Sequence, residues 1–362
     1  MKITDIQIVP FRTHADRFKN GRPSPHTELL QTVTRIVTDE GAEGYYFGGG
    51  AHGDQEGLLP DDRAVVLGRI RSLLDVELSV RTVFEAPTAA ALAVRIDGGE
   101  LDDATGAMGV LLPLRRNGDE PPLFCVHPAA GLSWCYAGLL RELRQGIPVY
   151  GLQSRDLLEP TSPATVAEKA ADFVKQIRSV REHGPYRLLG WSMGGHIAHE
   201  IAVQLQEQGD EVDLLVVMDS YPRMTGGPVT RDEIIADIFE GEDVLPSDLD
   251  NPQGQAKVMA VVRRGLGDHD WVTDEVAATV LENFVANTQA MLEQTPRRYR
   301  GSMVFIKGND PTPDGVRRPD RWAPYVDGQI VTHEVGCDHE DMIRPEVLDK
   351  VAAAVNQAVR SN

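Results

Sequence analysis

The sequence predicts an α/β fold with a mainly parallel sheet, preceded by a small N-terminal α+β region. From residue 123 onward, short apolar segments alternate with longer segments of helical spacing. This alternation is typical of a parallel sheet that helices cover on both faces. Most of the short segments are rich in Val, Ile, Leu, Tyr or Phe, as strands buried on both faces should be. They lie at residues 123–126, 148–152, 186–189, 214–218, 303–307 and 330–333.

Helical segments fill the gaps between these strands, for example at residues 163–182 and 345–359. The gap at about residues 223–298 is much longer than the others and contains several helical pieces but no strong strand. Loops of this length inside a compact domain usually have a function of their own. We therefore predict a helical lid over a site at this position.

The sequence before residue 121 falls into three zones of different composition. Residues 1–68 contain β-type segments at 3–11, 29–37 and 45–47, and residues 69–97 have the spacing of two or three short helices. Residues 98–120 are rich in Gly, Asp and Glu and are followed by two prolines, which predicts a linker. Residues 121–362 are then the main domain.

Charge and cysteine content exclude several kinds of partner. The 362 residues carry a net charge of −19, and the pI is near 4.9, so nucleic acids and anionic membranes would repel the protein. Three cysteines, Cys125, Cys135 and Cys337, fit reduced thiols better than a disulfide framework. Neither a secretion signal nor an apolar run of membrane-spanning length is present. We expect a cytoplasmic protein that binds neither nucleic acid nor membrane.

A serine stands in a motif that presents a nucleophile. The segment Gly190-Trp191-Ser192-Met193-Gly194 lies between the predicted strand at 186–189 and a predicted helix at 195–208. It matches the G-x-S-x-G elbow, in which a sharp turn from strand to helix exposes the serine hydroxyl. Glycines flank the serine because a Cβ would clash in so tight a turn. Ser192 is the predicted nucleophile.

A serine hydroxyl needs a base, and the base needs an acid that orients it. His339 is the candidate base, since its loop at 336–342 directly follows the last predicted strand and reaches the carboxyl edge of the sheet. His333 lies inside that strand and is a weaker candidate. Asp219 and Asp310 each follow a predicted strand after Ser192, so both stay possible as the acid. The apolar strand before Asp219 favours it over Asp310, which lies among typical loop residues.

The reaction also needs donors for a developing oxyanion, and fixed backbone amides suit this role. The amide of Met193 follows the nucleophile directly. A second donor should come from the loop at 127–131 after the first strand of the main domain, and the amide of Ala129 is the candidate. We expect His127 to be a packing or loop residue rather than a second base.

Another group of polar residues resembles a metal site only superficially. His196, His199 and Glu200 lie on one helix at spacings that metal ligands can have. A third ligand of the known zinc motifs is missing, and this helix must pack behind the elbow. We predict that the protein binds no metal.

Residues from about 119 to 360 resemble the terminal thioesterase domain of nonribosomal peptide synthetases, an α/β-hydrolase. The matching segments are 122–131, 150–154, 183–186, 190–195, 219–222 and 336–342. In that family the acid follows the strand directly after the nucleophile helix, which Asp219 matches and Asp310 does not. The resemblance thus implies a Ser192, Asp219 and His339 triad.

The resemblance also implies an activity. The enzyme would release a peptidyl or acyl chain from the phosphopantetheine of a carrier domain, through an acyl-Ser192 intermediate, by hydrolysis or macrocyclisation in antibiotic or siderophore biosynthesis. It would bind no cofactor of its own. The alternatives are a stand-alone editing thioesterase or general serine esterase, and a non-catalytic remnant that serves only binding.

Two upstream segments resemble other families. Residues 69–97 are similar to the carboxyl half of a peptidyl carrier domain, but the serine motif that accepts phosphopantetheine is absent. A carrier domain supplied in trans is therefore the expected partner. Residues 1–68 are similar to the capping domain of enolase-superfamily enzymes of the mandelate racemase type, without the barrel that bears their metal ligands and bases. We assign this fragment no catalysis.

Overall fold

The computed structural model divides the chain into two compact units, Met1–Asp103 and Ala104–Asn362. In the first unit it describes the backbone of residues 3–15, 18–19, 22–23, 27–38 and 43–48. In the second unit it describes residues 109–157, 165–222, 229–265, 273–309 and 317–361. The helices predicted within residues 69–97 lie outside the described residues.

The described part of the first unit consists of β-strands. Strands β1 (Ile3–Ala15), β4 (Thr27–Thr38) and β5 (Glu43–Gly48) form an antiparallel sheet in the order β1-β4-β5. Two short strands, β2 (Phe18–Lys19) and β3 (Arg22–Pro23), pair with each other. The three β-type segments predicted within residues 1–68 therefore coincide with the three long strands.

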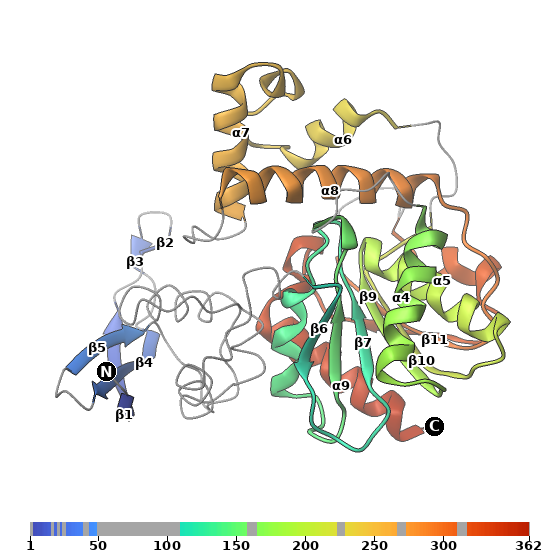
Figure 1. Ribbon diagram of the computed structural model, residues 1–362, viewed down its shortest axis with the longest axis horizontal. Coiled ribbons are helices and arrows are strands. Elements are labelled where there is room, and N and C mark those ends of the chain that lie inside the picture. Colours follow the sequence, from blue (N-terminus) through green and yellow to red (C-terminus); the bar gives the residue numbers. More distant parts are fainter. Residues whose placement is uncertain are drawn as a thin grey trace. The chain divides into compact units, whose positions relative to one another are not determined.

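The second unit contains a seven-stranded sheet in the order β12-β11-β10-β9-β7-β8-β6 (Figure 1). Neighbouring strands are parallel except for β6 and β8, which run antiparallel. The mainly parallel α/β fold predicted from the sequence is thus confirmed. The strands are β6 (Leu111–Arg115), β7 (Leu123–Val126), β8 (Val149–Leu152), β9 (Tyr186–Trp191), β10 (Val212–Met218), β11 (Met303–Lys307) and β12 (Ile330–Glu334).

Strand β6 corrects one expectation. It lies within residues 98–120, for which the sequence predicts a linker, and it forms the antiparallel edge of the sheet. Leu112 and Leu114 are buried on it, and the Arg115 guanidinium donates hydrogen bonds to the carbonyl of Ile147 at 2.8 and 3.0 Å. The sequence does not indicate this strand, because it is a single apolar segment of five residues in polar surroundings. The other strands were recognised because they alternate with helical segments.

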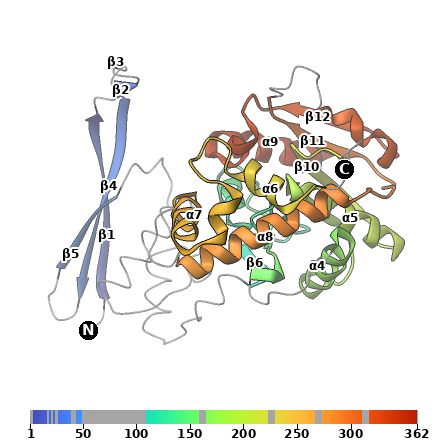
Figure 2. The same ribbon diagram turned by 90° about the horizontal axis from the view of Figure 1, so that it is seen from above.

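Helices cover both faces of this sheet. Helices α4 (Val166–Val180) and α5 (Met193–Glu207) pack together on one face, and α9 (Pro345–Ser361) packs with the 3-10 helix η2 (Trp134–Arg141) on the other (Figure 2). All four residues of β7 are fully buried, as the composition of the central strands predicts. The other 3-10 helices in the described part of the chain are η3 (Arg155–Leu157), η4 (Pro246–Asp250), η5 (Pro319–Tyr325) and η6 (His339–Ile343).

The described residues of the long gap between β10 and β11 form the α-helices α6 (Arg231–Ile238), α7 (Pro252–Gly265) and α8 (Asp274–Glu293). Helix α8 lies across the end of the sheet, with α6 and α7 on its far side (Figures 1 and 2). The three helices share a small apolar core of their own, to which α8 contributes Ala277, Leu281 and Val285. Among the described residues, no helix has the length and apolar character needed to cross a bilayer.

Two buried histidines should make the folded state sensitive to acid. Burial is the main cause that lowers the pKa of both His127 and His199 to about 4. Between pH 6.5 and 4 the unfolded chain therefore binds protons that the folded chain does not, so stability falls as the pH falls through this range. Each histidine contributes a slope of up to about 1.4 kcal/mol per pH unit.

Thermal melting between pH 7.5 and 4.5 measures this effect. We expect His199→Gln to flatten the dependence of the melting temperature on pH, because the variant lacks one group that takes up a proton on unfolding. An unaltered slope in the His199 variant would contradict the assignment.

Candidate active site

Ser192 occupies a strained turn between β9 and α5. Its backbone has φ 55° and ψ −124°, a conformation that residues with a Cβ rarely adopt. The two glycines of the motif allow the turn: a Cβ at Gly190 would lie 2.0 Å from the carbonyl oxygen of Gly194, and a Cβ at Gly194 would lie 2.4 Å from that of Val126. The sequence motif thus has the strained elbow geometry that exposes a nucleophile.

Asp219 and His339 meet at the carboxyl edge of the sheet. Asp219 directly follows β10, and its Oδ2 atom accepts a hydrogen bond from His339 Nδ1 at 2.8 Å. His339 begins the 3-10 helix η6 in the loop after β12. Because a carboxylate can only accept, Nδ1 carries the proton and Nε2 is left to act as a base. Sequence spacing left Asp219 and Asp310 open, and the geometry pairs the base with Asp219, while Asp310 lies outside the described residues.

The environment of Asp219 keeps it ionised. Its side chain is fully buried, and burial by itself opposes ionisation. Hydrogen bonds from His339 and Tyr221, the charge of His339 and a hydrogen bond from the Gly308 amide together outweigh burial, so the pKa of Asp219 lies below its ordinary value. The Arg317 guanidinium lies 3.7 Å from Oδ2 and adds a positive charge on the same side.

Tyr221 holds the second oxygen of this carboxylate. Its hydroxyl donates to Asp219 Oδ1 at 2.7 Å, and the Gly308 amide donates to the same oxygen at 3.1 Å. We expect Tyr221→Phe to lower kcat about three- to tenfold, because one hydrogen bond to a charged group is lost while another remains. Steady-state kinetics on an acyl-thioester measure this. A variant with undiminished kcat would show that the hydroxyl contributes nothing.

The turn that carries Ser192, the predicted nucleophile, approaches His339, the predicted base. The Trp191 ring, next to Ser192 in the chain, lies 5.3 Å from the His339 ring between centroids. Among the described residues, no hydrogen bond joins Ser192 Oγ to His339. Such bonds are often loose before substrate binds. His333, the weaker base candidate, lies on β12 at the edge of the sheet, opposite Ile306 in register.

The loop at 127–131 approaches the elbow from the neighbouring strand. β7 and β9 are adjacent, with Val126 opposite Gly190. The buried Tyr136 hydroxyl donates to the carbonyl of Val126 at 2.7 Å and accepts from the amide of Trp191 at 2.9 Å. It therefore fixes the loop that carries Ala129 relative to the turn that carries Ser192 and Met193.

The buried histidines His127, His196 and His199 have structural partners. His127 is fully buried, and its Nδ1 atom donates to the carbonyl of Pro128 at 2.7 Å. His196 bonds to Gln294 and to a backbone carbonyl, and His199 bonds to another backbone carbonyl. Glu200 forms an ion pair with Arg297 at 2.5 Å. No group of three metal-ligating side chains occurs among the described residues.

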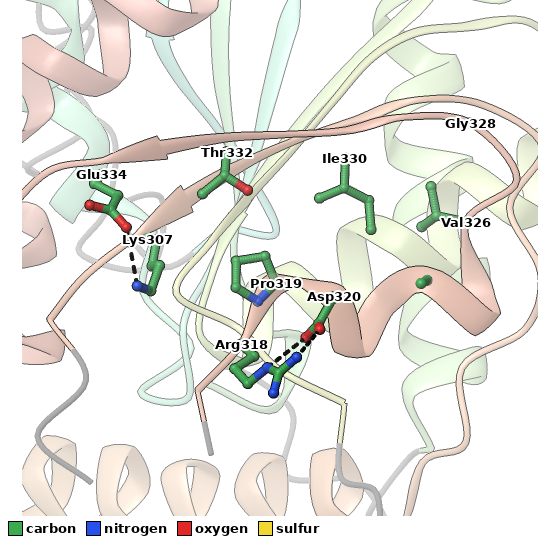
Figure 3. Close-up of a pocket in the computed structure, with 10 residues that line it drawn as sticks. Lys307, Arg318, Pro319, Asp320, Val326, Gly328, Ile330, Thr332 and Glu334 are labelled. Atoms are coloured by element: carbon green, nitrogen blue, oxygen red, sulfur yellow. Dashed lines mark hydrogen bonds and ion pairs between the residues drawn. The ribbon is translucent and has the colours of Figure 1, made fainter. Parts of the chain in front are cut away.

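A separate open cavity of about 590 Å³ lies beside β12 and η5 (Figure 3). Its charged side chains pair with each other, Lys307 with Glu334 and Arg318 with Asp320. None of its lining residues belongs to the elbow, to the Asp219–His339 pair or to the loop at 127–131. We therefore do not place the acyl-transfer site there.

Comparison with known proteins identifies the family. The model of the thioesterase domain family matches residues 121–358. The chain belongs to the thioesterase domain family. The thioesterase domain shares its fold with the Vlm2 thioesterase domain, solved with a bound dodecadepsipeptide, at a TM-score of 0.55 and 19% identity over 69% of this chain and 98% of that one. The predicted α/β-hydrolase fold is thereby confirmed, as is the resemblance to thioesterase domains.

Curated relatives of the thioesterase domain are much longer proteins. The chain is 40% identical to the dimodular nonribosomal peptide synthase of Bacillus subtilis (strain 168) over an alignment of 298 residues, and the match covers 79% of this chain and 12% of that protein. It is 36% identical to malpinin synthetase of Mortierella alpina over an alignment of 309 residues, and the match covers 82% of this chain and 4% of that protein. The chain thus spans only a small part of the relatives that it matches.

Sequence reasoning gave no role to several residues that support the site. Tyr221 appeared only as part of a family-like segment, although its position two residues after the acid was a signal. Tyr136 gave no comparable signal, and neither did Asn287 of α8, whose Nδ2 atom donates to the carbonyl of Ala129 at 2.8 Å. Nothing in the sequence around either residue indicates a contact with a distant strand or loop.

Proposed function

We propose that this thioesterase domain releases a peptidyl or acyl chain from the phosphopantetheine thiol of a carrier domain in nonribosomal peptide biosynthesis. Ser192 would be the nucleophile, His339 the base and Asp219 the acid that orients it. The single observation that carries the proposal is the 2.8 Å hydrogen bond between His339 and Asp219 beside a strained serine elbow, in a chain that belongs to the thioesterase family.

In the first half of the reaction, Ser192 Oγ attacks the carbonyl carbon of the thioester and transfers its proton to His339 Nε2. The negative charge on the carbonyl oxygen is stabilised by the amides of Met193 and Ala129. When the C–S bond breaks, His339 returns the proton to the leaving thiol. Asp219 holds the imidazole in the required tautomer and stabilises its positive charge.

In the second half, His339 takes a proton from water or from an internal nucleophile of the acyl chain. That nucleophile attacks the acyl-Ser192 ester, the C–O bond breaks and Ser192 recovers its proton. Water would give a linear product and an internal nucleophile a macrocycle. The insertion at about 223–298 would act as a lid that shields the ester from premature hydrolysis, and the position of α8 across the end of the sheet supports this.

The carrier domain is proposed to act in trans. Residues 69–97, which lie outside the described residues, resemble a carrier remnant without the phosphopantetheine serine. The match to the Bacillus subtilis relative covers 79% of the 362 residues, about 286, whereas residues 121–362 number 242. At least about 40 matched residues therefore precede the thioesterase domain, which supports a carrier-like origin for this part.

No cofactor is part of the proposal, and residues 1–68 would contribute no chemistry. Their strands are those of a small antiparallel sheet, compatible with a fragment of an enolase-superfamily capping domain. Free Cys125, Cys135 and Cys337, together with the acidic composition, support a cytoplasmic location.

Presentation of the same acyl group in three forms tests the proposal. The group is offered on a phosphopantetheine-loaded carrier domain, on free pantetheine and as a small oxoester. We expect kcat/KM for the carrier-linked thioester to exceed that for the pantetheine thioester at least about tenfold, since remote contacts contribute to transition-state binding. Equal efficiency on all three would instead favour a general serine esterase. A folded protein that a fluorophosphonate does not label would favour a non-catalytic remnant.

A further inference from the structure

We propose that Asn287, together with Asn283, positions the oxyanion loop, defined as residues 127–131. Both asparagines lie on α8, the helix of the insertion that crosses the end of the sheet. This inference rests on the proposed function, in which the amide of Ala129 is an oxyanion donor. It assigns to the insertion a direct part in the alignment of the site, in addition to shielding.

The two asparagines are buried at positions where a helix normally packs apolar side chains. Asn287 is fully buried and Asn283 is 3% exposed. They are four residues apart and therefore lie on the same face of α8, and Asn287 Nδ2 donates to Asn283 Oδ1 at 3.1 Å. Buried amides are unfavourable unless they are hydrogen-bonded, so their partners indicate what they are for.

Those partners are the carbonyls of the oxyanion loop. Asn287 Nδ2 donates to the carbonyl of Ala129 at 2.8 Å, and Asn283 Nδ2 donates to that of Ala130 at 3.1 Å. Ser154 completes the arrangement: its amide donates to the carbonyl of Gly131 at 2.9 Å, and its hydroxyl donates to Asn283 Oδ1 at 3.0 Å. Three successive carbonyls of the loop are thus held by side chain or backbone donors.

These contacts determine where the amide of Ala129 points. In a trans peptide the N–H points away from the preceding C=O, and the carbonyl of Pro128 is held by His127 Nδ1 at 2.7 Å and by the Gly131 amide at 2.9 Å. The next peptide group, between Ala129 and Ala130, is held by Asn287, which donates to the Ala129 carbonyl. Both peptide planes that meet at Ala129 are therefore fixed, as a preorganised oxyanion donor requires.

Helix α8 is suited to this role because it is fixed on two sides. Ala277, Leu281 and Val285 pack against α6 and α7, whereas the stripe that contains the two asparagines faces the oxyanion loop. The residue after the helix, Gln294, bonds to His196 of α5 at 2.9 Å. The position of the insertion and the geometry of the oxyanion loop are therefore coupled through α8.

Replacement of Asn287 with residues of similar shape tests the proposal. Asn287→Leu removes the donor without adding charge, and Asn287→Asp retains the shape but, when ionised, cannot donate. Gln289→Leu is the matched control, since Gln289 is an exposed amide on the same helix. For each protein we would measure folding by thermal melting, kcat and KM on an acyl-pantetheine thioester, and the rate and endpoint of fluorophosphonate labelling of Ser192.

We expect both Asn287 variants to reach the wild-type endpoint of labelling. Their kcat should be lowered about 10- to 100-fold and their KM should stay within about threefold of wild type. The loss in kcat should be smaller than for deletion of an oxyanion donor, because the Ala129 amide is still present but points in another direction. The labelling rate should fall at least about tenfold, since phosphonylation also places an oxygen in the oxyanion site, and Gln289→Leu should behave as wild type. Folded Asn287 variants with kcat and labelling rate within twofold of wild type would overturn the proposal. A change in KM alone would also overturn it, as would a loss of kcat that occurs only in the charged Asn287→Asp variant.

The two proposals can fail separately. If the wild-type protein cleaves no acyl-thioester, the proposed function is wrong, but the ratio of labelling rates between wild type and the Asn287 variants still decides whether Asn287 positions the loop. If Asn287→Asp fails to fold, Asn287→Leu decides alone, and if Asn287→Leu fails to fold, Asn287→Ala replaces it as the uncharged variant without a donor.

Discussion

Replacement of Ser192 with alanine is expected to lower kcat for an acyl-pantetheine thioester by about 10⁴-fold or more. The hydroxyl is the only group proposed to form a covalent bond with the acyl chain, and loss of the nucleophile leaves only the binding and oxyanion contributions to catalysis. The effect should appear in kcat rather than in KM, because alanine leaves the elbow backbone and the substrate contacts in place.

Steady-state kinetics and fluorophosphonate labelling measure this result. The Ser192→Ala variant should melt near the wild-type temperature and should not label, whereas Ser179→Ala, an exposed serine near the end of α4, should label and turn over normally. Unchanged thioester cleavage by the Ser192 variant would refute its role as nucleophile.

Asp219→Asn is expected to lower kcat by about 10⁴-fold at neutral pH. The asparagine amide has the same shape but can turn its NH2 group toward Nδ1 of His339, which then favours the tautomer with the proton on Nε2. In that tautomer the imidazole cannot accept the proton of Ser192. The partly buried positive charge that forms on His339 during the reaction would also lose its partner, now 2.8 Å away.

Asp338→Asn is the matched control for this variant. Asp338 is exposed, precedes His339 in the chain and accepts only a 3.3 Å hydrogen bond from Asn309 among the described side chains. Asp338→Asn therefore removes one negative charge next to His339 without loss of the orienting hydrogen bond. Similar losses of kcat in Asp219→Asn and Asp338→Asn would contradict the prediction. They would mean that Asp219 acts only through its negative charge or only supports the loop that carries it.

Much of the fold could be predicted because the central strands are buried on both faces and stand out as apolar segments. The predicted strands at 123–126 and 303–307 coincide with β7 and β11. β6 was not recognised because an edge strand of five residues in polar surroundings has no such pattern. The elbow was predictable for a related reason, since Gly190 and Gly194 are required by contacts within the turn itself.

The site was predictable as far as its residues follow strand ends. Asp219 and His339 could be proposed from chain order and family resemblance, and their hydrogen bond agrees with that pairing, while their catalytic roles stay predictions. Spacing alone could not choose between Asp219 and Asp310, because both follow strands after Ser192. The support from Tyr136 and Asn287 depends on contacts between distant elements, which sequence patterns do not reveal.

Mass spectrometry of the protein during turnover tests the central claim most directly, namely that the acyl chain passes through Ser192. The wild-type protein would be mixed with a panel of acyl-pantetheine thioesters, quenched within the first turnovers and digested. We predict that the mass of the acyl group appears on the peptide that contains Ser192, for at least one thioester, and that Ser192→Ala shows none. Thioester cleavage by wild type with no acyl group on this peptide at any quench time, or with the acyl group on another residue, would contradict the account.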